Sequence, residues 1–234
     1  MKILVLGTAR SKSNYITASL AEYYKLDYIY EPYRVCFEEN IKRNYTKNLI
    51  DSLKKVTQLL DKRDNFVMKL EVTNLIPNGY NRLLNLNLFN WKNFDKIFTT
   101  SRINLSDTIA SLTIAQDLGR YFNTKDSLPS PKITPREFSI KLRNDRISVY
   151  SALRDREILK ATQEWLKKNN INYTEVFYET ADTFIKNELR DARQNIWLKN
   201  DYDYQSIFTN YSEIENLAND LKKYILQQYK FETS

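Results

Sequence analysis

Short apolar runs alternate along the chain with longer stretches in which apolar residues recur every three or four positions. The short runs are typical of strands buried in a sheet, and the longer stretches are typical of amphipathic helices. The predicted strands cover residues 3–6, 26–30, 66–71, 94–100 and 171–178. Three predicted helices cover residues 38–61, 105–121 and 136–168. Two more begin near residue 13 and near residue 181, and a last helix ends near residue 229. This alternation predicts an α/β fold with three layers, α/β/α, around a central, mostly parallel sheet.

The first predicted strand, Ile3–Leu6, runs through Gly7 into a short, polar and basic turn with the sequence T-A-R-S-K-S. Because a helix begins directly after this turn, several backbone N–H groups and the positive end of the helix point at one place. The turn adds cations and hydroxyl donors, from Arg10, Lys12, Thr8, Ser11 and Ser13. The sequence therefore predicts a binding site for a phosphate or a sulfate. The alternative is an ordinary strand-to-helix turn with scattered basic residues.

A second basic position follows the predicted strand of residues 94–100. Arg102 stands at the carboxyl end of that strand, and Ser111 lies nine positions later on the next predicted helix. Part of this span is loop, so we expect the two side chains to converge on one anion. An arginine fork and a serine hydroxyl both suit a phosphate. The alternative is that Arg102 is a surface residue and Ser111 a small residue in helix packing.

A general base has to be sought among Glu, Asp, Lys and Tyr, because the chain has no histidine. Ser-His-Asp triads, Cys-His pairs and histidine zinc sites are excluded for the same reason. Glu31 is the first choice, because it ends the second predicted strand at the sheet edge where ligands of open parallel sheets bind. Pro32 prevents the strand from continuing. Glu31 has two alternative roles: it is a surface carboxylate beside a turn, or it forms an ion pair with Arg10.

The third predicted strand contains a lysine, which is unusual for a strand buried on both faces. Lys69 and Glu71 are two positions apart and therefore share a face. Such a lysine needs a partner or a bound anion. A pair with Glu71, exposure at the strand end, and a role in the site all remain open.

Composition narrows the class of protein. The 234 residues are enough for one α/β domain over 1–234, and 42% hydrophobic and 28% charged residues are typical of a soluble globular chain. We expect a cytoplasmic protein, because no apolar run spans a membrane and no signal region precedes the first strand. The single cysteine, Cys36, excludes an intramolecular disulfide. The net charge of +7 favours an anionic ligand, but lysine and arginine alternate with acids, so we expect no specific nucleic-acid partner.

The two anion-binding patterns resemble those of sulfotransferases that use 3′-phosphoadenosine 5′-phosphosulfate, most closely the bacterial, phage and carbohydrate enzymes. The family's loop reads R-S-G-S-T, and Arg10, Ser11 and Ser13 match it. Lys12 replaces the glycine and Asn14 replaces the threonine. The pattern T-x-R-(x)8-S-L is similar to the family's 3′-phosphate site. Weaker likenesses are a Glu-Pro pair after the second strand, a Tyr-Glu pair at positions 178–179, and an N-Y-x-E-I segment before the last helix.

The resemblance implies a P-loop NTPase-like sulfotransferase fold and an enzyme that transfers a sulfuryl group to a hydroxyl or an amine. It implies that Arg10 stabilises the charge on the transferring group and that Glu31 takes the acceptor's proton. The donor nucleotide is a co-substrate, and no metal is expected. The implied donor-binding residues are Thr8, Ala9, Arg10, Ser11, Lys12, Ser13, Asn14, Arg102 and Ser111. The acceptor, a small molecule or a carbohydrate in the first instance but also a lipid or a peptide tyrosine, is not specified by the sequence, and neither is the oligomeric state.

Two other functions remain open. A P-loop kinase or phosphotransferase would use Lys12 and Ser13 as its Walker residues with ATP and Mg²⁺. However, the loop lacks the second glycine of G-x-x-x-x-G-K-[ST], and Glu31 and Glu71 do not form a clean Walker B motif. A non-catalytic binder of nucleotides or nucleic acid would rely on the basic charge, and its affinity would fall steeply with salt. The Pro- and Ser-rich loop of residues 127–131 is a candidate lid or acceptor-site loop.

Overall fold

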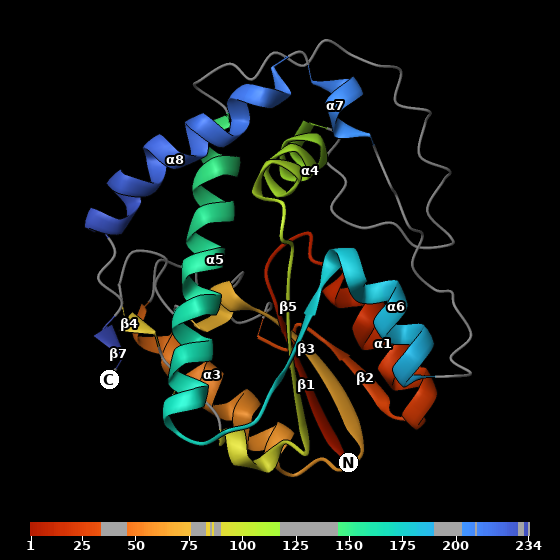
Figure 1. Ribbon diagram of the computed structural model, residues 1–234. Helices are drawn as coiled ribbons and strands as arrows, with labels where there is room; N and C mark the ends of the chain where they lie inside the picture. Colours follow the sequence, from red (N-terminus) through yellow and green to blue (C-terminus); the bar gives the residue numbers. More distant parts are fainter. Residues whose placement is uncertain are drawn as a thin grey trace.

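A five-stranded sheet forms the centre of the molecule (Figure 1). The computed structural model describes residues 1–33, 46–75, 83–84, 86, 90–117, 145–189, 203–208, 210–228 and 232–233. The strands of the sheet are β1 (Lys2–Gly7), β2 (Asp27–Tyr30), β3 (Phe66–Glu71), β5 (Lys96–Ser101) and β6 (Thr174–Phe177). Their order is β2-β3-β1-β5-β6, and every neighbouring pair is parallel. The prediction of an α/β fold is confirmed, with a central sheet that is wholly parallel.

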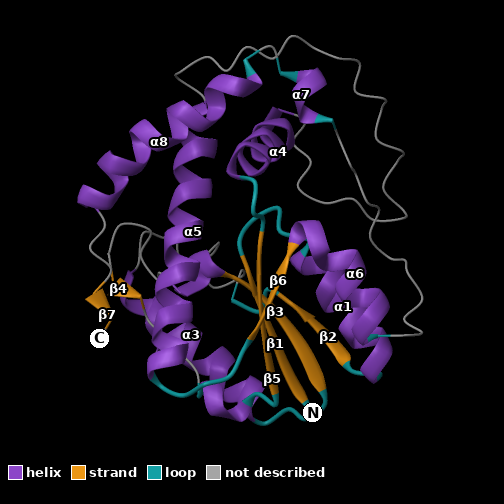
Figure 2. Cartoon of the chain, in the orientation of Figure 1, coloured by secondary structure: helices purple, strands orange, loops and turns teal. Residues whose placement is uncertain are grey.

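Helices cover both faces of the sheet, as Figure 2 shows. On one face, α1 (Ser13–Tyr24) and α6 (Ala181–Glu188) pack against the odd-numbered residues of β1, Ile3 and Val5. On the other face, α3 (Thr46–Asp61) and α5 (Asp145–Lys168) pack against the even-numbered residues, Leu4 and Leu6. Alternate side chains of a strand point to opposite faces, so a continuous apolar run is what a strand between two helical layers requires. The three-layer prediction is therefore confirmed.

A third apolar cluster lies beyond the carboxyl ends of the strands, at the top of Figure 1. It joins α4 (Leu105–Asp117), the first half of α5, α7 (Tyr204–Ile207) and α8 (Tyr211–Gln228). Its buried members include Ile109, Leu153 and Ile214. This helical layer covers part of the sheet edge at which ligands of open parallel sheets bind.

The register places the end of the first strand between the ends of its two neighbours. Gly7 pairs with Glu71 of β3 on one side and with Thr100 of β5 on the other. The connection that follows β1 leads to β2 on one side of β1, whereas the connection that follows β3 leads to β5 on the other side. Such a switch in direction opens a crevice at the carboxyl ends of the strands, where ligands bind in open α/β sheets.

Several element boundaries differ from those expected. The strand expected from residue 94 begins at Lys96, because residues Trp91–Asn93 form a 3₁₀ turn and the Asp95 carboxylate accepts a hydrogen bond from the Lys2 N–H at 2.6 Å. The strand expected from residue 171 begins at Thr174. Residues 38–45, 118–121 and 136–144 of the expected helices, the loop of residues 127–131, and Cys36 lie outside the described residues. Within the described ranges, no helix is long and apolar enough to cross a membrane.

The remaining elements are short. They are the 3₁₀ turns at Val72–Leu75 and Tyr178–Thr180 and a two-residue parallel pair, β4 (Leu83–Leu84) with β7 (Glu232–Thr233). Of these, only the turn at Tyr178–Thr180 lies at the candidate site.

Candidate functional site

The loop after β1 is closely packed against the end of β5. Gly7 has no room for a side chain, because a Cβ there would lie 2.4 Å from Thr100 Oγ1 and 2.7 Å from Ser13 Cβ. The Thr8 N–H donates a hydrogen bond of 3.0 Å to the Thr100 carbonyl. The buried Ser11 hydroxyl donates to the Thr8 carbonyl at 2.7 Å and lies 2.8 Å from Thr100 Oγ1. The side chain of Ser11 therefore supports the loop from inside.

Two loop residues have left-handed backbone conformations. Arg10 has φ of 62° and Lys12 has φ of 59°, a region that costs a non-glycine residue about 1 kcal/mol or more. Lys12 stands where the sulfotransferase loop has glycine, and it adopts the conformation that favours glycine. A glycine at position 12 would adopt this backbone conformation without strain.

The amino end of α1 has no side-chain cap. Lys12 precedes the helix, and its side chain makes no capping hydrogen bond. The first turn contains no acidic residue, and the first backbone bond of the helix runs from the Ile16 N–H to the Lys12 carbonyl. The N–H groups of the first turn and the positive end of the helix dipole therefore face the loop, and this arrangement stabilises an anion.

The structure brings the loop and the β5–α4 pattern together. Arg10 Nε donates a hydrogen bond of 2.7 Å to Ser111 Oγ, across 101 positions of sequence. Ser111 lies on α4 and is 3% exposed. The sequence predicts that Arg102 and Ser111 converge, but the recorded partner of Ser111 is Arg10. Ser111 therefore links the two predicted anion-binding patterns.

Arg102 pairs with the same face of α4 one helical turn earlier. Its Nη2 lies 3.0 Å from Asp107 Oδ2, and Asp107 and Ser111 are four positions apart on the helix. Side chains at this spacing are neighbours on a helix surface, so both arginines face one side of α4. Arg102 is 8% exposed, so the alternative of a surface arginine is wrong.

Aromatic rings and a second carboxylate surround the Arg102 guanidinium. Its Cζ lies 4.0 Å from the ring centre of Tyr178 and 5.2 Å from that of Tyr204. Its Nε is buried and has no hydrogen-bond acceptor among the described residues, and the Glu179 carboxylate lies 3.9 Å away. Glu179 is itself held by the N–H groups of Ile103 and Asn104, at 3.1 and 3.3 Å. Stacked and paired in this way, the guanidinium is held in one place, while its Nε has no acceptor in the described part of the chain.

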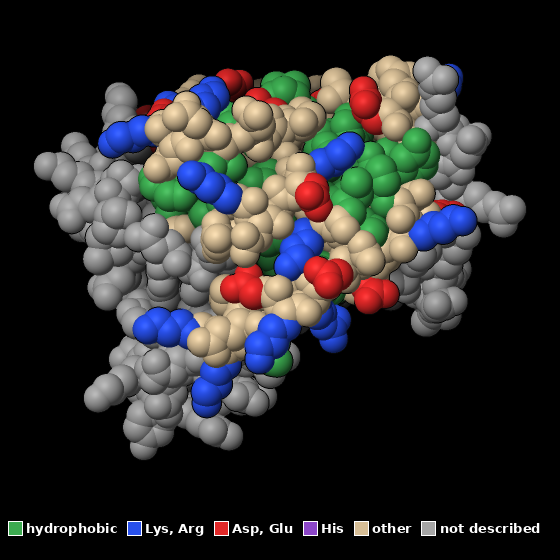
Figure 3. Space-filling view, turned by 90° about the horizontal axis from the view of Figure 1, so that it is seen from below, with side chains coloured by type: hydrophobic (Ala, Val, Ile, Leu, Met, Phe, Trp, Pro, Cys, Tyr) green, Lys and Arg blue, Asp and Glu red, His purple; other side chains and the backbone are tan. Residues whose placement is uncertain are grey.

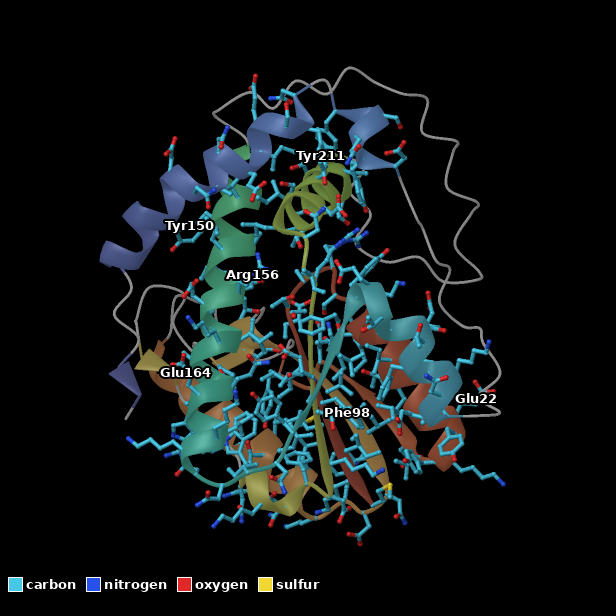
Figure 4. The ribbon with its side chains drawn as sticks, in the orientation of Figure 1. Glu22, Phe98, Tyr150, Arg156, Glu164 and Tyr211 are labelled. Carbon is cyan, nitrogen blue, oxygen red and sulfur yellow. The ribbon has the colours of Figure 1, made fainter. Side chains whose placement is uncertain are left out.

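The amino end of α4 is capped by Asn104. Asn104 Oδ1 accepts a hydrogen bond of 3.2 Å from the Asp107 N–H. Tyr211, at the start of α8, donates to Asp107 Oδ1 at 2.5 Å and lies against α4 in Figure 4. Burial, with a contribution from the bond to Asp107, raises the pKa of Tyr211 to about 12. These contacts fix Asp107 beside Arg102.

The Lys12 ammonium lies beside α6 and the turn that follows β6. Its Nζ lies 3.3 Å from Asp182 Oδ2 on α6 and 4.1 Å from the ring centre of Tyr178. A Walker lysine has to reach the phosphates that its own loop binds. This ammonium instead lies against α6 and the ring that also contacts Arg102.

Glu31 is part of a buried ion-pair cluster. Its carboxylate is in contact with Lys69 Nζ, which also lies 3.1 Å from Glu71 Oε1. Glu31 is 8% exposed and has φ of 38°, and its N–H donates to the Lys69 carbonyl at 3.1 Å. The alternative of a surface carboxylate is therefore wrong, and of the alternatives left open for Lys69 the pair with Glu71 is present. Glu31 does stand at the carboxyl edge of the sheet, where the sequence places it.

Asp155 is a site residue that the sequence analysis missed. It lies on α5, is 4% exposed, and accepts hydrogen bonds from the Arg154 guanidinium at 3.0 and 3.1 Å and from the Ala9 N–H of the loop. Burial, reinforced by Glu71 and opposed by Arg154 and the Ala9 N–H, raises the pKa of Asp155 to about 6. The sequence does contain a signal for a buried carboxylate, because Asp155 lies three positions after Ala152 and therefore on the apolar face of a helix.

Ser13 and Asn14 complete the loop and begin α1. Ser13 is buried at the start of α1, and its carbonyl accepts a hydrogen bond of 2.7 Å from Thr17 Oγ1. The side-chain oxygen of Asn14 is buried and has no hydrogen-bond donor among the described residues. An ammonium, hydroxyl or N–H group of a ligand is the kind of partner that such an oxygen accepts.

No protein-family model matches this chain, and no curated protein shows significant similarity to it.

Proposed function

We propose that the chain is a sulfotransferase, which transfers a sulfuryl group from 3′-phosphoadenosine 5′-phosphosulfate to a hydroxyl or an amine of a small-molecule or carbohydrate acceptor. The hydrogen bond between Arg10 Nε and Ser111 Oγ carries this proposal, because it unites the two anion-binding patterns in one site. Each pattern alone is common, but a ligand with two separate anionic groups needs both at a short distance from each other.

The described residues fit such a donor. The uncapped amino end of α1, together with Arg10, suits the 5′ group, because N–H donors and a helix dipole stabilise an anion there. Arg102 suits a 3′-phosphate: it is buried, stacked on Tyr178, and has an Nε without an acceptor among the residues described. A buried donor of this kind gains a hydrogen bond from a phosphate oxygen.

Sulfuryl transfer needs little covalent chemistry from the protein. The bond between sulfur and the bridging oxygen breaks, a bond from sulfur to the acceptor atom forms, and one proton leaves the acceptor. Positioning and charge stabilisation supply most of the acceleration in the related phosphoryl transfers. In this proposal Arg10 stabilises the charge on the bridging oxygen, Glu31 takes the proton, and Lys69 holds the Glu31 carboxylate in position.

The position of Lys12 favours a sulfotransferase over an ATP-dependent kinase. Its ammonium contacts Asp182 and Tyr178, on the side of the loop where Arg102 lies. The distribution of charge on the face drawn in Figure 3 also argues against a nucleic-acid surface on that face. On the described part of the face in Figure 3, lysine and arginine side chains lie among aspartate and glutamate side chains, whereas nucleic-acid binding requires a continuous basic area.

Titration calorimetry with adenosine 3′,5′-bisphosphate, ADP and ATP, with and without Mg²⁺, tests the proposal. We expect the wild type to prefer the bisphosphate without Mg²⁺, and Arg102→Ala to lose about tenfold or more of that affinity, which is the effect of one charge-assisted hydrogen bond. Arg63→Ala, an exposed arginine before β3, is the matched control and leaves the affinity unchanged. A preference for ATP with Mg²⁺, or no binding of any nucleotide, overturns the proposal.

A further inference from the structure

One aromatic ring is shared by two cations of the site. Lys12 Nζ lies 4.1 Å from the ring centre of Tyr178, and Arg102 Cζ lies 4.0 Å from the same centre. The two cations are therefore no further apart than the sum of these distances. A phosphate with one oxygen directed to each cation, at about 2.8 Å per hydrogen bond, spans a separation of this size. Lys12 thus belongs to the surroundings of Arg102, although the chain places it in the β1–α1 loop.

Each of these cations is held by carboxylates that solvent can reach. Lys12 pairs with Asp182, whose side chain is 40% exposed, and Arg102 pairs with Asp107 and Glu179, whose side chains are 23% and 34% exposed. The cations themselves are much less exposed, at 11% and 7%. An incoming phosphate can replace an exposed carboxylate with little loss, because the released carboxylate is solvated by water.

We propose that Lys12 is a second ligand of the donor's 3′-phosphate, and that it leaves Asp182 to bind this group together with Arg102. This inference rests on the proposed function and extends it, because it assigns the lysine that replaces the family's glycine to the 3′ end of the donor. The backbone of Lys12 already has the conformation that glycine adopts, so the change from glycine to lysine adds an ammonium without changing the course of the loop.

A purely structural role for Lys12 predicts different behaviour. In that case the ion pair with Asp182 only tethers the loop to α6, and removal of either partner loosens the loop in the same way. In the proposed role the two partners act in opposite directions. Loss of Lys12 removes a ligand of the phosphate, whereas loss of the Asp182 carboxylate removes a competitor of the phosphate. The sign of the effect of Asp182→Asn therefore separates the two roles.

The test compares adenosine 3′,5′-bisphosphate with adenosine 5′-monophosphate by titration calorimetry. The dissociation constant of the monophosphate divided by that of the bisphosphate is the ratio that isolates the contribution of the 3′-phosphate. We expect Lys12→Met and Lys12→Gly to reduce this ratio about tenfold, the value of one charge-assisted contact, and Asp182→Asn to increase it a few-fold. Lys12→Met retains the apolar part of the side chain, so a result is obtained even where the glycine variant is less stable.

Lys25→Gly is the matched control. Lys25 follows the other end of α1 with φ of 53°, so its replacement by glycine relieves a similar left-handed conformation far from the loop. We expect its ratio to equal that of the wild type. The inference is overturned if the Lys12 variants keep the wild-type ratio, or if Asp182→Asn lowers the ratio as Lys12→Met does. A wild type that binds neither nucleotide overturns the proposed function itself, and this inference with it.

Discussion

The buried carboxylate of Asp155 is expected to make the stability of the protein depend on pH. Burial raises the pKa of Asp155 from 3.8 to about 6 in the folded protein. The folded state then binds this proton more tightly than the unfolded state. The contribution of Asp155 to the free energy of unfolding is therefore fully present below about pH 4, falls as the pH rises from about 4 to about 6, and is lost above pH 6. The shift corresponds to about 3 kcal/mol, at 1.36 kcal/mol for each pKa unit.

Asp155→Asn removes the titration while it keeps the shape of the side chain. Urea unfolding between pH 4 and pH 7.5, followed by circular dichroism, measures the free energy of unfolding of both proteins. We expect the variant to gain about 2 kcal/mol relative to the wild type as the pH rises across this range, since part of the effect lies below pH 4. Asp220→Asn, an exposed position on α8, is the control and should follow the wild type. Parallel curves for Asp155→Asn and the wild type would refute the reasoning, since they would mean that Arg154 and the Ala9 N–H fully offset the burial.

Two further predictions concern residues that shape the site. Gly7→Ala introduces a methyl group 2.4 Å from Thr100 Oγ1, so we expect the free energy of unfolding, measured in urea, to fall by about 1–3 kcal/mol. Adding Thr100→Ala should recover part of this loss, and an unchanged stability of Gly7→Ala contradicts the close approach. Lys69→Met leaves the Glu31 carboxylate buried without its ammonium and should cost about 3–5 kcal/mol by the same measurement. Adding Glu31→Gln should restore part of that loss, whereas the exposed control Lys62→Met should change little. A loss for Lys69→Met as small as that of Lys62→Met would contradict the paired arrangement.

The sheet and its carboxyl edge could be predicted from the sequence, because local patterns determine them. A four-residue apolar run such as Ile3–Leu6 is compatible with a strand between two helical layers, and the polar residues directly after each run then fall at one edge. A helix cap depends on residues three positions apart, so the sequence offers local candidates for the cap of α4, Asn104 and Ser106, and the structure has Asn104.

The partners of the individual side chains could not be predicted in this way. The sequence pairs Ser111 with Arg102, whereas its recorded partner is Arg10. The choice depends on how α4 leaves β5, since this angle decides which turn of the helix faces which arginine. Asp155 was missed because its contact with the Ala9 N–H joins a helix and a loop that no local pattern relates.

The distribution of charge in the site bears on its selectivity. Lys12 and Arg102 are already balanced by Asp182, Asp107 and Glu179. A ligand with one phosphate gains the contacts of the β1–α1 loop but leaves these pairs intact. In the proposed function, a second phosphate gains the hydrogen bond of Arg102 Nε directly, but it contacts Lys12 only by displacing the Asp182 carboxylate, which returns to water. The net gain for the second phosphate is therefore smaller than two isolated cations would give, and it increases when a competing carboxylate such as that of Asp182 is removed.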